Sequence, residues 1–412
     1  HPLQDLDQRV AEGLIRVSVG AGDNPDAQGA ISILTELIRC PSVTPDAGAA
    51  LDLIENHLKG AGFECNRLTF QAPGTEAVDN LFARLGARHP HLCIAGHADV
   101  LPPGDEASWS AAPFAGEISD GRIIGRGAED MKGALAAALA AAPALVAGGG
   151  TLNGSLSFLI TGDEEGPSVN GTKPVLEWMA KHGHTPDHCI VGEPTNTGAI
   201  GDTVKIGRRG ALTGTLIVTG VQGHSAYPER AANPIPSLMR LIEAISDPLD
   251  AGTEHFAPSN LEVVSVDTGN PSQNTIPAEC RALFNIRFND CWTAASLEAW
   301  LRERLATARL DDRISWQLET WSTAEAFVTK PGELVELMGG AIEAETGLTP
   351  ELSTAGGTSD ARFVAPYCPV VEFGLVGRSM HQIDEHVPLA ELEQLTRIYR
   401  AVMERYFAGS PT

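Results

Sequence analysis

Five potential metal ligands, His97, Asp130, Glu165, Glu193 and His381, each lie just after a short apolar run, although the chain separates them widely. The runs are HLCIA, GRIIGRG, SLSFLIT, HCIVG and VVEFGLV, in that order. Short apolar runs of this kind predict buried strands. In an open α/β sheet, ligands gather beyond the carboxyl ends of the strands, so the pattern predicts one convergent site.

Length and charge limit the class of protein. A chain of 412 residues exceeds what one hydrophobic core usually supports, so we expect about two domains. The net charge of −24 argues against binding to nucleic acid or to anionic membranes. We interpret it as a charge that keeps the protein surface solvated. The longest apolar stretch, residues 134–147, is interrupted by Pro143 and is shorter than the roughly 20 residues that cross a bilayer.

The cysteines and the first residues favour a cytoplasmic protein. The seven cysteines show no C-x-x-C spacing, and an odd number in a chain this long does not resemble a disulfide framework. Residues 1–30 contain no basic region followed by an apolar core, as an export signal would. We therefore expect free thiols in a reducing compartment.

The order of the patterns predicts an α/β fold with an insertion. Strand-like and helical patterns alternate over residues 30–208 and return over 324–412, which indicates one catalytic α/β domain in two parts. Residues 209–323 have the order βαββαβ of a ferredoxin-like unit, whose open sheet makes it a candidate for dimerisation. Residues 1–29 are expected to form a loosely held N-terminal extension.

Three of the motifs carry chemistry only in combination. His97 and Asp99 point to the same side of an extended strand, so Asp99 is placed to accept the second imidazole N–H; alone, the pair is more typical of surface polarity. Asp130 precedes a helical pattern and by itself would be interpreted as an N-cap. In TGDEEG, Glu164 and Glu165 would point in opposite directions in extended backbone, so one could bind metal while the other serves as general base.

Charge favours a two-metal site. Two neutral imidazoles and three carboxylates balance two divalent cations once a hydroxide is added, and mixed nitrogen and oxygen ligands suit zinc, with cobalt as a possible substitute. A serine hydrolase is disfavoured because the chain has no G-x-S-x-G motif. A metal-free binding protein on the same fold remains an alternative from another class.

The chain resembles a known family through motifs that occur in one order. They are GHADVLPPGD, GRGAEDMKG, TGDEEG, VGEPT, GRRG, QGHSAYP, NTIPAE and GGTSDARF. With them the chain is similar to the M20 family of metallo-aminoacylases and carboxypeptidases, and within that family to the desuccinylases. The resemblance implies a zinc-exopeptidase-like α/β domain with an inserted dimerisation domain, and a homodimer.

The resemblance also implies roles for individual residues. Asp130 would bridge two zinc ions, His97 and Glu193 would complete one site, and Glu165 and His381 the other. Glu164 would be the general base and Asp99 the orienting carboxylate. His224 would reach the active site of the partner chain and stabilise the oxyanion, although its pattern alone is typical of a polar turn.

For the substrate, the resemblance implies a small anionic N-acyl amino acid, N-succinyl-LL-2,6-diaminopimelate, cleaved to succinate and LL-2,6-diaminopimelate. Arg209, Asn274, Arg287 and Thr358 match positions that hold substrate in the desuccinylases, and arginine is the natural partner of a carboxylate. The chain departs from close relatives at Gly377, where they have Asn. Other M20 amidases, such as acetylornithine deacetylases, aminoacylases and glutamate carboxypeptidases, are the alternatives within the class.

Overall fold

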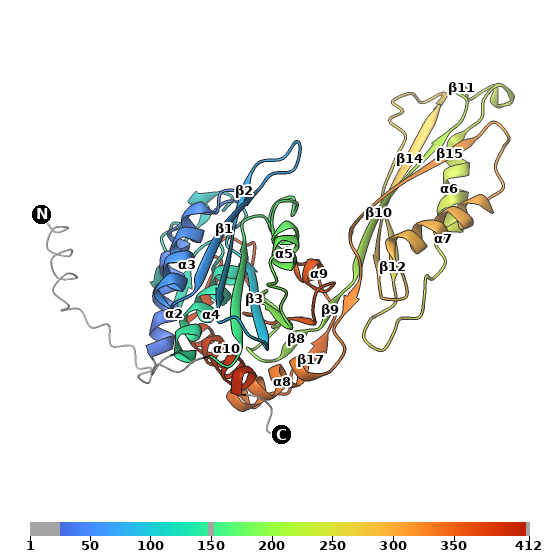
Figure 1. Ribbon diagram of the computed structural model, residues 1–412. Helices are drawn as coiled ribbons and strands as arrows, with labels where there is room; N and C mark the ends of the chain where they lie inside the picture. Colours follow the sequence, from blue (N-terminus) through green and yellow to red (C-terminus); the bar gives the residue numbers. More distant parts are fainter. Residues whose placement is uncertain (1–24, 147–151, 409–412) are drawn as a thin grey trace, which may run out of the picture.

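The computed structural model describes residues 25–146 and 152–408, which form a larger and a smaller part (Figure 1). The larger part is built on an eight-stranded mixed sheet of order β1-β2-β6-β3-β7-β18-β8-β17. Its strands are β1 (Glu64–Phe70), β2 (Val78–Leu85), β3 (His91–His97), β6 (Ser155–Thr161), β7 (His188–Val191), β8 (Thr203–Lys205), β17 (Glu351–Ser353) and β18 (Val370–Glu372).

Helices cover both faces of this sheet. One layer contains α2 (Pro25–Ile38), α3 (Gly48–Gly60), α4 (Gly133–Ala141), α8 (Glu333–Thr346) and α10 (Leu389–Ala408); α5 (Thr172–Lys181) and α9 (Ala361–Val364) lie on the other face. Every residue of α4 is buried, because its alanine-rich sequence lets α2 and α10 pack closely around it. Coverage on both faces explains why β3 and β6 are buried along their whole length, without an exposed face.

The parallel strands β6, β3 and β7 are neighbours, so they end at the same edge of the sheet. The strand predicted before Asp130 does not belong to this sheet. It is β5 (Arg122–Ile124), which forms a separate three-stranded sheet with β4 (Glu117–Ser119) and β19 (His386–Pro388). The prediction was wrong about the sheet because β5 pairs antiparallel with β4 and with β19, which lies more than 250 positions later in the chain, and an apolar run does not reveal its pairing partners.

The smaller part has the predicted order βαββαβ. Its elements are β10 (Gly210–Thr219), α6 (Pro234–Ala244), β12 (Asn260–Asp267), β14 (Glu279–Phe288), α7 (Ala294–Ala306) and β15 (Ser315–Ala324), and the sheet order is β12-β14-β10-β15. Alternate residues of β14, among them Phe284 and Ile286, are buried with α6 and α7 in a core of their own. The paired strands β9 (Gly207–Arg208) and β16 (Phe327–Val328) connect the two parts. The short strands β11 (Gly223–His224) and β13 (Thr275–Ile276) form a ribbon beyond the four-stranded sheet.

Two expected boundaries differ from the structure. Helix α2 begins at Pro25, inside the expected extension, and Asp26 pairs with Arg400 of α10; residues 1–24 of that extension lie outside the described residues. The helical pattern expected after Asp130 is α4 followed by the 3-10 turn Ala142–Leu145, because Pro143 lacks the N–H that would continue an α-helix. Residues 147–151 are outside the described range.

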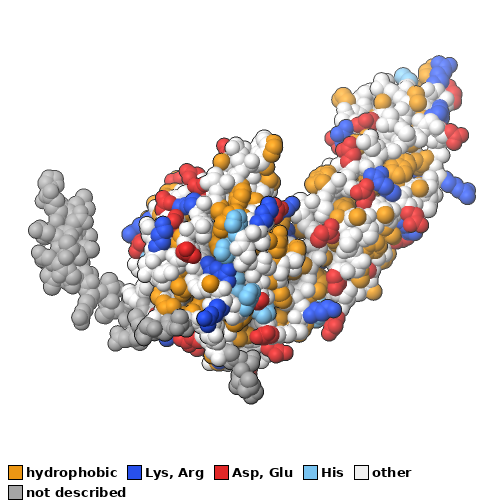
Figure 2. Space-filling view, in the orientation of Figure 1, with side chains coloured by type: hydrophobic (Ala, Val, Ile, Leu, Met, Phe, Trp, Pro, Cys, Tyr) orange, Lys and Arg blue, Asp and Glu red, His pale blue; other side chains and the backbone are white. Residues whose placement is uncertain are grey.

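The visible surface carries charges of both signs (Figure 2). Acidic and basic side chains are interspersed over both parts on the face shown in Figure 2. Among the described helices, none combines the length and the apolar character that crossing a membrane requires. The seven cysteines, all of them described, form no disulfide.

Candidate metal centre

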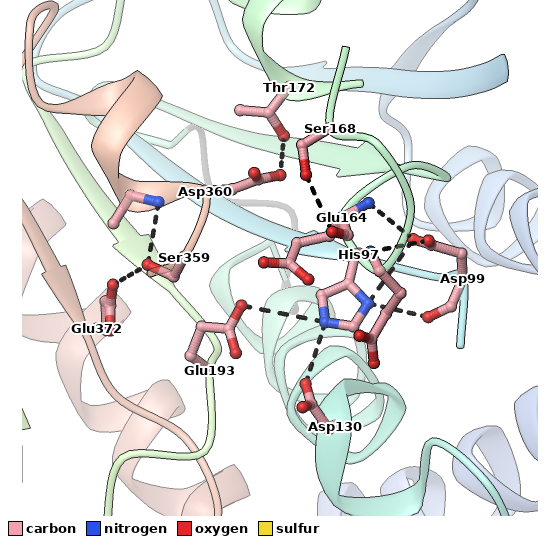
Figure 3. Close-up of polar contacts among 12 residues, drawn as sticks. His97, Asp99, Asp130, Glu164, Ser168, Thr172, Glu193, Ser359, Asp360 and Glu372 are labelled. Carbon is pink, nitrogen blue, oxygen red and sulfur yellow. Dashed lines mark hydrogen bonds and ion pairs between the residues drawn. The ribbon is translucent and has the colours of Figure 1, made fainter. Parts of the chain in front are cut away.

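The five predicted ligands come together around the carboxylate of Asp130. Its Oδ1 lies 3.1 Å from Nε2 of His97, and its Oδ2 lies 3.1 Å from Nε2 of His381. Glu193 Oε1 is 4.0 Å from His97 Nε2, and Glu165 Oε1 is 3.3 Å from His381 Nε2. One carboxylate therefore lies between two imidazoles, each of which has a second carboxylate beside it (Figure 3 shows the His97 side).

The parallel strands explain much of this convergence. His97 ends β3, Glu165 lies in the turn after β6, and Glu193 follows β7. Asp130 and His381 instead come from loops, since Asp130 follows the turn after β5 and His381 lies well beyond β18. Asp130 caps neither the short helical turn Ala128–Lys132 nor α4, so the N-cap interpretation of this residue was wrong.

Asp99 lies in the site but does not make the predicted contact with its side chain. Nδ1 of His97 lies 2.9 Å from the backbone carbonyl oxygen of Asp99, whereas the nearer carboxylate oxygen is 3.7 Å away. The carboxylate accepts the backbone N–H groups of Glu164 at 3.3 Å and Glu165 at 3.1 Å. The two acids therefore stand in a turn that Asp99 holds, and not in the extended backbone that the sequence suggested.

The donor set fits divalent cations. Ligand atoms of His97, Asp130 and Glu165 lie within 4.8 Å of one another, and so do those of His97, Glu164 and Glu193. Burial raises the pKa of Glu193 well above its usual value, and the charges of Asp130 and Glu164 add to that effect. Burial lowers the pKa of His97, but Asp130 and the neighbouring glutamates raise it well above its usual value. Without cations these groups must share protons, which is the electrostatic situation that bound metal ions relieve.

A cavity of about 610 Å³ opens beside the cluster. Of the four predicted substrate residues, only Thr358 lines it. The lining also contains two arginines that the sequence analysis did not select. The lining residues are Asp130, Glu164, Glu165, Gly166, Pro167, Ser168, Glu193, Pro194, Arg208, Thr323, Gly357, Thr358, Arg362, Phe363, Met380 and His381.

The two cavity arginines differ in their partners. Arg208 is paired with the buried Glu372 and donates to the carbonyl oxygen of Gly357 at 3.0 Å. Nε of Arg362 is buried without a hydrogen-bond partner, and within the described residues its guanidinium forms no ion pair. The arginine in GGTSDARF could have been selected from the sequence, because it lies four positions after Thr358 in the same motif.

Arg209 and Arg287 lie where the smaller sheet joins the larger part. Nη1 of Arg209 donates to Asn260 Oδ1 at 3.1 Å, and Asn260 is in register with Arg287. Neither arginine lines the cavity. In GRRG, it is the first arginine, Arg208, that faces the cavity, because alternate residues of an extended segment point in opposite directions.

His224 and Asn274 lie together at the far end of the smaller part (Figure 1, label β11). The backbone N–H of Ser225 donates to the carbonyl oxygen of Asn274 at 2.9 Å, and His224 is in register with Thr275. Both residues are exposed, and neither lines the cavity of its own chain.

Comparison with known proteins identifies close relatives. The profile of "Peptidase family M20/M25/M40" matches residues 93–405. A succinyl-diaminopimelate desuccinylase of Rhodopseudomonas palustris (strain TIE-1) is 58% identical over 384 residues, covering 92% of this chain and 98% of the relative. The protein of that name from Bradyrhizobium diazoefficiens is 56% identical, covering 92% and 99%.

Solved structures of lower identity share the fold. The aminopeptidase PepT from Bacillus cereus superposes with a TM-score of 0.74 at 19% identity, covering 93% of this chain and 99% of that one. The YXEP protein of Bacillus subtilis, described as a dinuclear metal-binding peptidase of the M20 family, gives a TM-score of 0.67 at 15% identity, covering 92% and 97%.

Proposed function

The chain belongs to peptidase family M20/M25/M40, and on that premise we propose that it hydrolyses N-succinyl-LL-2,6-diaminopimelate to succinate and LL-2,6-diaminopimelate. Relatives named for this activity are up to 58% identical over almost their whole length. The observation that carries the proposal is one cavity that contains both a cluster of metal-ligating groups and Arg362, whose Nε is buried without a hydrogen-bond partner among the residues that the structure describes.

Two zinc ions are the proposed cofactors, with cobalt as a substitute. Asp130 would be shared between them, His97 and Glu193 would hold one, and Glu165 and His381 the other; the contacts of the two Asp130 oxygens support this division. When bound, such a pair polarises a carbonyl group and lowers the pKa of water.

Glu164 is the proposed general base. Burial raises its pKa to about 8, against the charge of His97 and with the help of Asp360 and Asp130. Divalent cations bound beside Glu164 would lower this pKa, so that the ionised carboxylate accepts a proton from water and returns it to the leaving amine near neutral pH. Asp99 orients Glu164 through the backbone N–H and acts as a positioning residue.

The substrate carries several carboxylates, and the cavity contains the guanidinium of Arg362, which lies 4.4 Å from the centroid of the Phe363 ring and within the described residues forms no ion pair. Arg362 is the proposed partner of a substrate carboxylate, with Thr358 beside it. An arginine fork binds a carboxylate through two parallel hydrogen bonds, which an N-acetyl substrate without that carboxylate does not form. Arg209 and Arg287, near the junction of the two parts, are proposed to meet the substrate when the parts approach each other.

A homodimer would bring His224 to the cavity. In one chain His224 and Asn274 lie at the far tip of the smaller part, so we propose that both serve the active site of the partner chain. There, the imidazole of His224 would stabilise the oxyanion. The cytoplasm is the proposed compartment, because it keeps free thiols reduced.

A substrate panel tests the function. We expect the zinc-loaded and cobalt-loaded protein to hydrolyse N-succinyl-LL-2,6-diaminopimelate faster than N-acetylornithine, other N-acetyl amino acids or N-acyl glutamates. Faster turnover of N-acetylornithine would instead identify another amidase of the family. Absence of bound metal together with absence of hydrolysis would favour a binding protein on the same fold.

A further inference from the structure

Two buried glutamates that bind no metal in the proposed function connect the loops that carry Asp130 and His381. We call residues 125–130 the Asp130 loop and residues 377–386 the His381 loop. Glu129 belongs to the first loop and Glu385 to the second, and the side chains of both are almost fully buried. We propose that these two carboxylates form a reciprocal clasp that sets the positions of Asp130 and His381 before metal binds.

Glu385 reaches from the His381 loop into the Asp130 loop. Its Oε1 accepts the backbone N–H groups of Glu129 at 2.9 Å and Asp130 at 3.1 Å. Its Oε2 accepts the N–H of Gly127 at 3.0 Å and Nη1 of Arg126 at 2.8 Å. The backbone N–H of Asp130 itself is therefore fixed by a residue of the other loop.

Glu129 makes the opposite connection. Its Oε2 accepts the backbone N–H of Ser379 at 2.7 Å, two positions before His381. Oγ of Ser379 in turn accepts the N–H of His386 at 3.0 Å, which closes the His381 loop on itself. Each loop thus supplies the carboxylate that anchors the other.

The conformation of the two loops requires such anchors. His381 has φ 64°, in the left-handed region that residues other than glycine adopt uncommonly. Gly127 has φ 81°, and a Cβ there would lie 2.4 Å from Cγ1 of Val100. Conformations of this kind persist where the surrounding structure fixes them.

The charge balance also argues for a specific role. Within the described residues, Arg126 is the only cation paired with either glutamate of the clasp. Burying two carboxylates against one guanidinium is unfavourable unless hydrogen bonds compensate, and here those bonds are directed to the two loops that carry proposed ligands. Partners that orient metal ligands change metal affinity when they are removed, typically by about 10–100-fold.

The inference rests on the proposed metal function, and zinc titration into the metal-free protein tests it without measuring activity. Glu385→Gln replaces one acceptor oxygen with an NH2 group that faces N–H donors. Because Asp130 is shared, we expect both zinc equivalents to bind about 10–100-fold more weakly, as measured by competition with a chromophoric chelator. Glu129→Ala releases only the His381 loop, so we expect the zinc equivalent held by Glu165 and His381 to weaken and the other to change less.

Asp250→Asn is the matched control. Asp250 also accepts backbone N–H groups, those of Gly252 at 2.8 Å and Ser259 at 3.1 Å, but it lies in the smaller part. We expect this variant to bind zinc with wild-type affinity, even where its melting temperature falls.

The outcomes separate the clasp from the metal site. Wild-type zinc affinity in Glu129→Ala and Glu385→Gln, with only a lower melting temperature of the metal-free protein, would reduce both residues to structural anchors and overturn the clasp. If Glu385→Gln does not fold, Glu129→Ala alone decides between these results. Failure of the wild-type protein to bind zinc would overturn the proposed function itself.

Discussion

The edge of the large sheet and the tip of the smaller part both carry predicted catalytic residues, but in opposite settings. At the sheet edge, His97, Asp130 and Glu193 are buried and within a few ångströms of one another. At the tip, His224 and Asn274 are exposed on a two-stranded ribbon. Asp130 and Glu193 at the sheet edge line a cavity of their own chain, whereas the two residues at the tip do not line that cavity.

The difference bears on the proposed dimer. A buried cluster of acids is stable only when its charges are compensated, and metal ions can do this within one chain. We expect the exposed imidazole of His224 to act on a substrate only where the surface of another chain encloses the imidazole together with the substrate. Variants in the two regions test this difference, and they follow in order of decreasing expected effect.

Glu164→Gln tests the assembled region. The amide cannot accept a proton from water, so we expect turnover of the succinyl substrate to fall by about 10²–10⁴-fold. Metal content, measured by elemental analysis, should remain at the wild-type level. Glu165→Gln is the neighbouring control and should lose metal. Turnover near wild type in Glu164→Gln would remove this residue from the role of base.

His224→Ala tests the exposed region. If the imidazole stabilises the oxyanion, we expect turnover to fall by about 10²–10³-fold, with the zinc affinity unchanged because His224 is not among the grouped metal-ligating residues. Mixing this variant with Glu164→Gln under subunit exchange should restore part of the activity, since one site of the mixed dimer then has both groups. With exchange verified, mixtures as inactive as their components would exclude action across the dimer.

Arg362→Ala tests whether the cavity recognises the succinyl carboxylate. Hydrogen bonds to charged groups contribute about 1.5–3 kcal/mol, so we expect kcat/KM for the succinyl substrate to fall by about 10–100-fold. Hydrolysis of the matching N-acetyl compound should change little, and Arg362→Lys should retain part of the preference. An equal loss with both substrates would assign Arg362 a general role in the cavity.

Asp250→Asn addresses the smaller part without touching either site. Burial is the largest single influence on the pKa of Asp250 and raises it. Hydrogen bonds from Ser259, Gly252 and Trp292 together outweigh burial and lower this pKa to about 2. Since the folded-state pKa is depressed, this stabilisation is present above about pH 4 and is lost as the pH falls toward 2. We expect the variant to unfold about 1–3 kcal/mol more easily at pH 7, with a smaller difference from wild type near pH 3 and unchanged turnover.

Thermal unfolding at several pH values measures this effect. Asp290→Asn, an exposed acid of the same part, should change stability by less than about 0.5 kcal/mol. A constant difference between Asp250→Asn and wild type from pH 7 to pH 3 would contradict the assigned pKa.

The sequence predicted most of the fold for identifiable reasons. The runs that became β3, β6 and β7 are buried on both faces and have no competing pattern. In β14, alternate positions include Phe284 and Ile286, and the residues at these positions are buried. Two predictions failed. β5 lies in a small sheet instead of the large one, and the carboxylate of Asp99 accepts hydrogen bonds from the backbone of a turn instead of from the imidazole.

By itself, the sequence determined which chemical groups are present and at which strand ends most of them lie, because the apolar pattern that marks a strand is a local property of the chain. Only the tertiary structure decided that Asp130 stands between two imidazoles, that Arg208 and Arg362 face the cavity, and that His224 lies at the distant tip. These outcomes depend on contacts between segments far apart in the chain, such as those of Glu385 with the Asp130 loop, and no local pattern encodes such contacts.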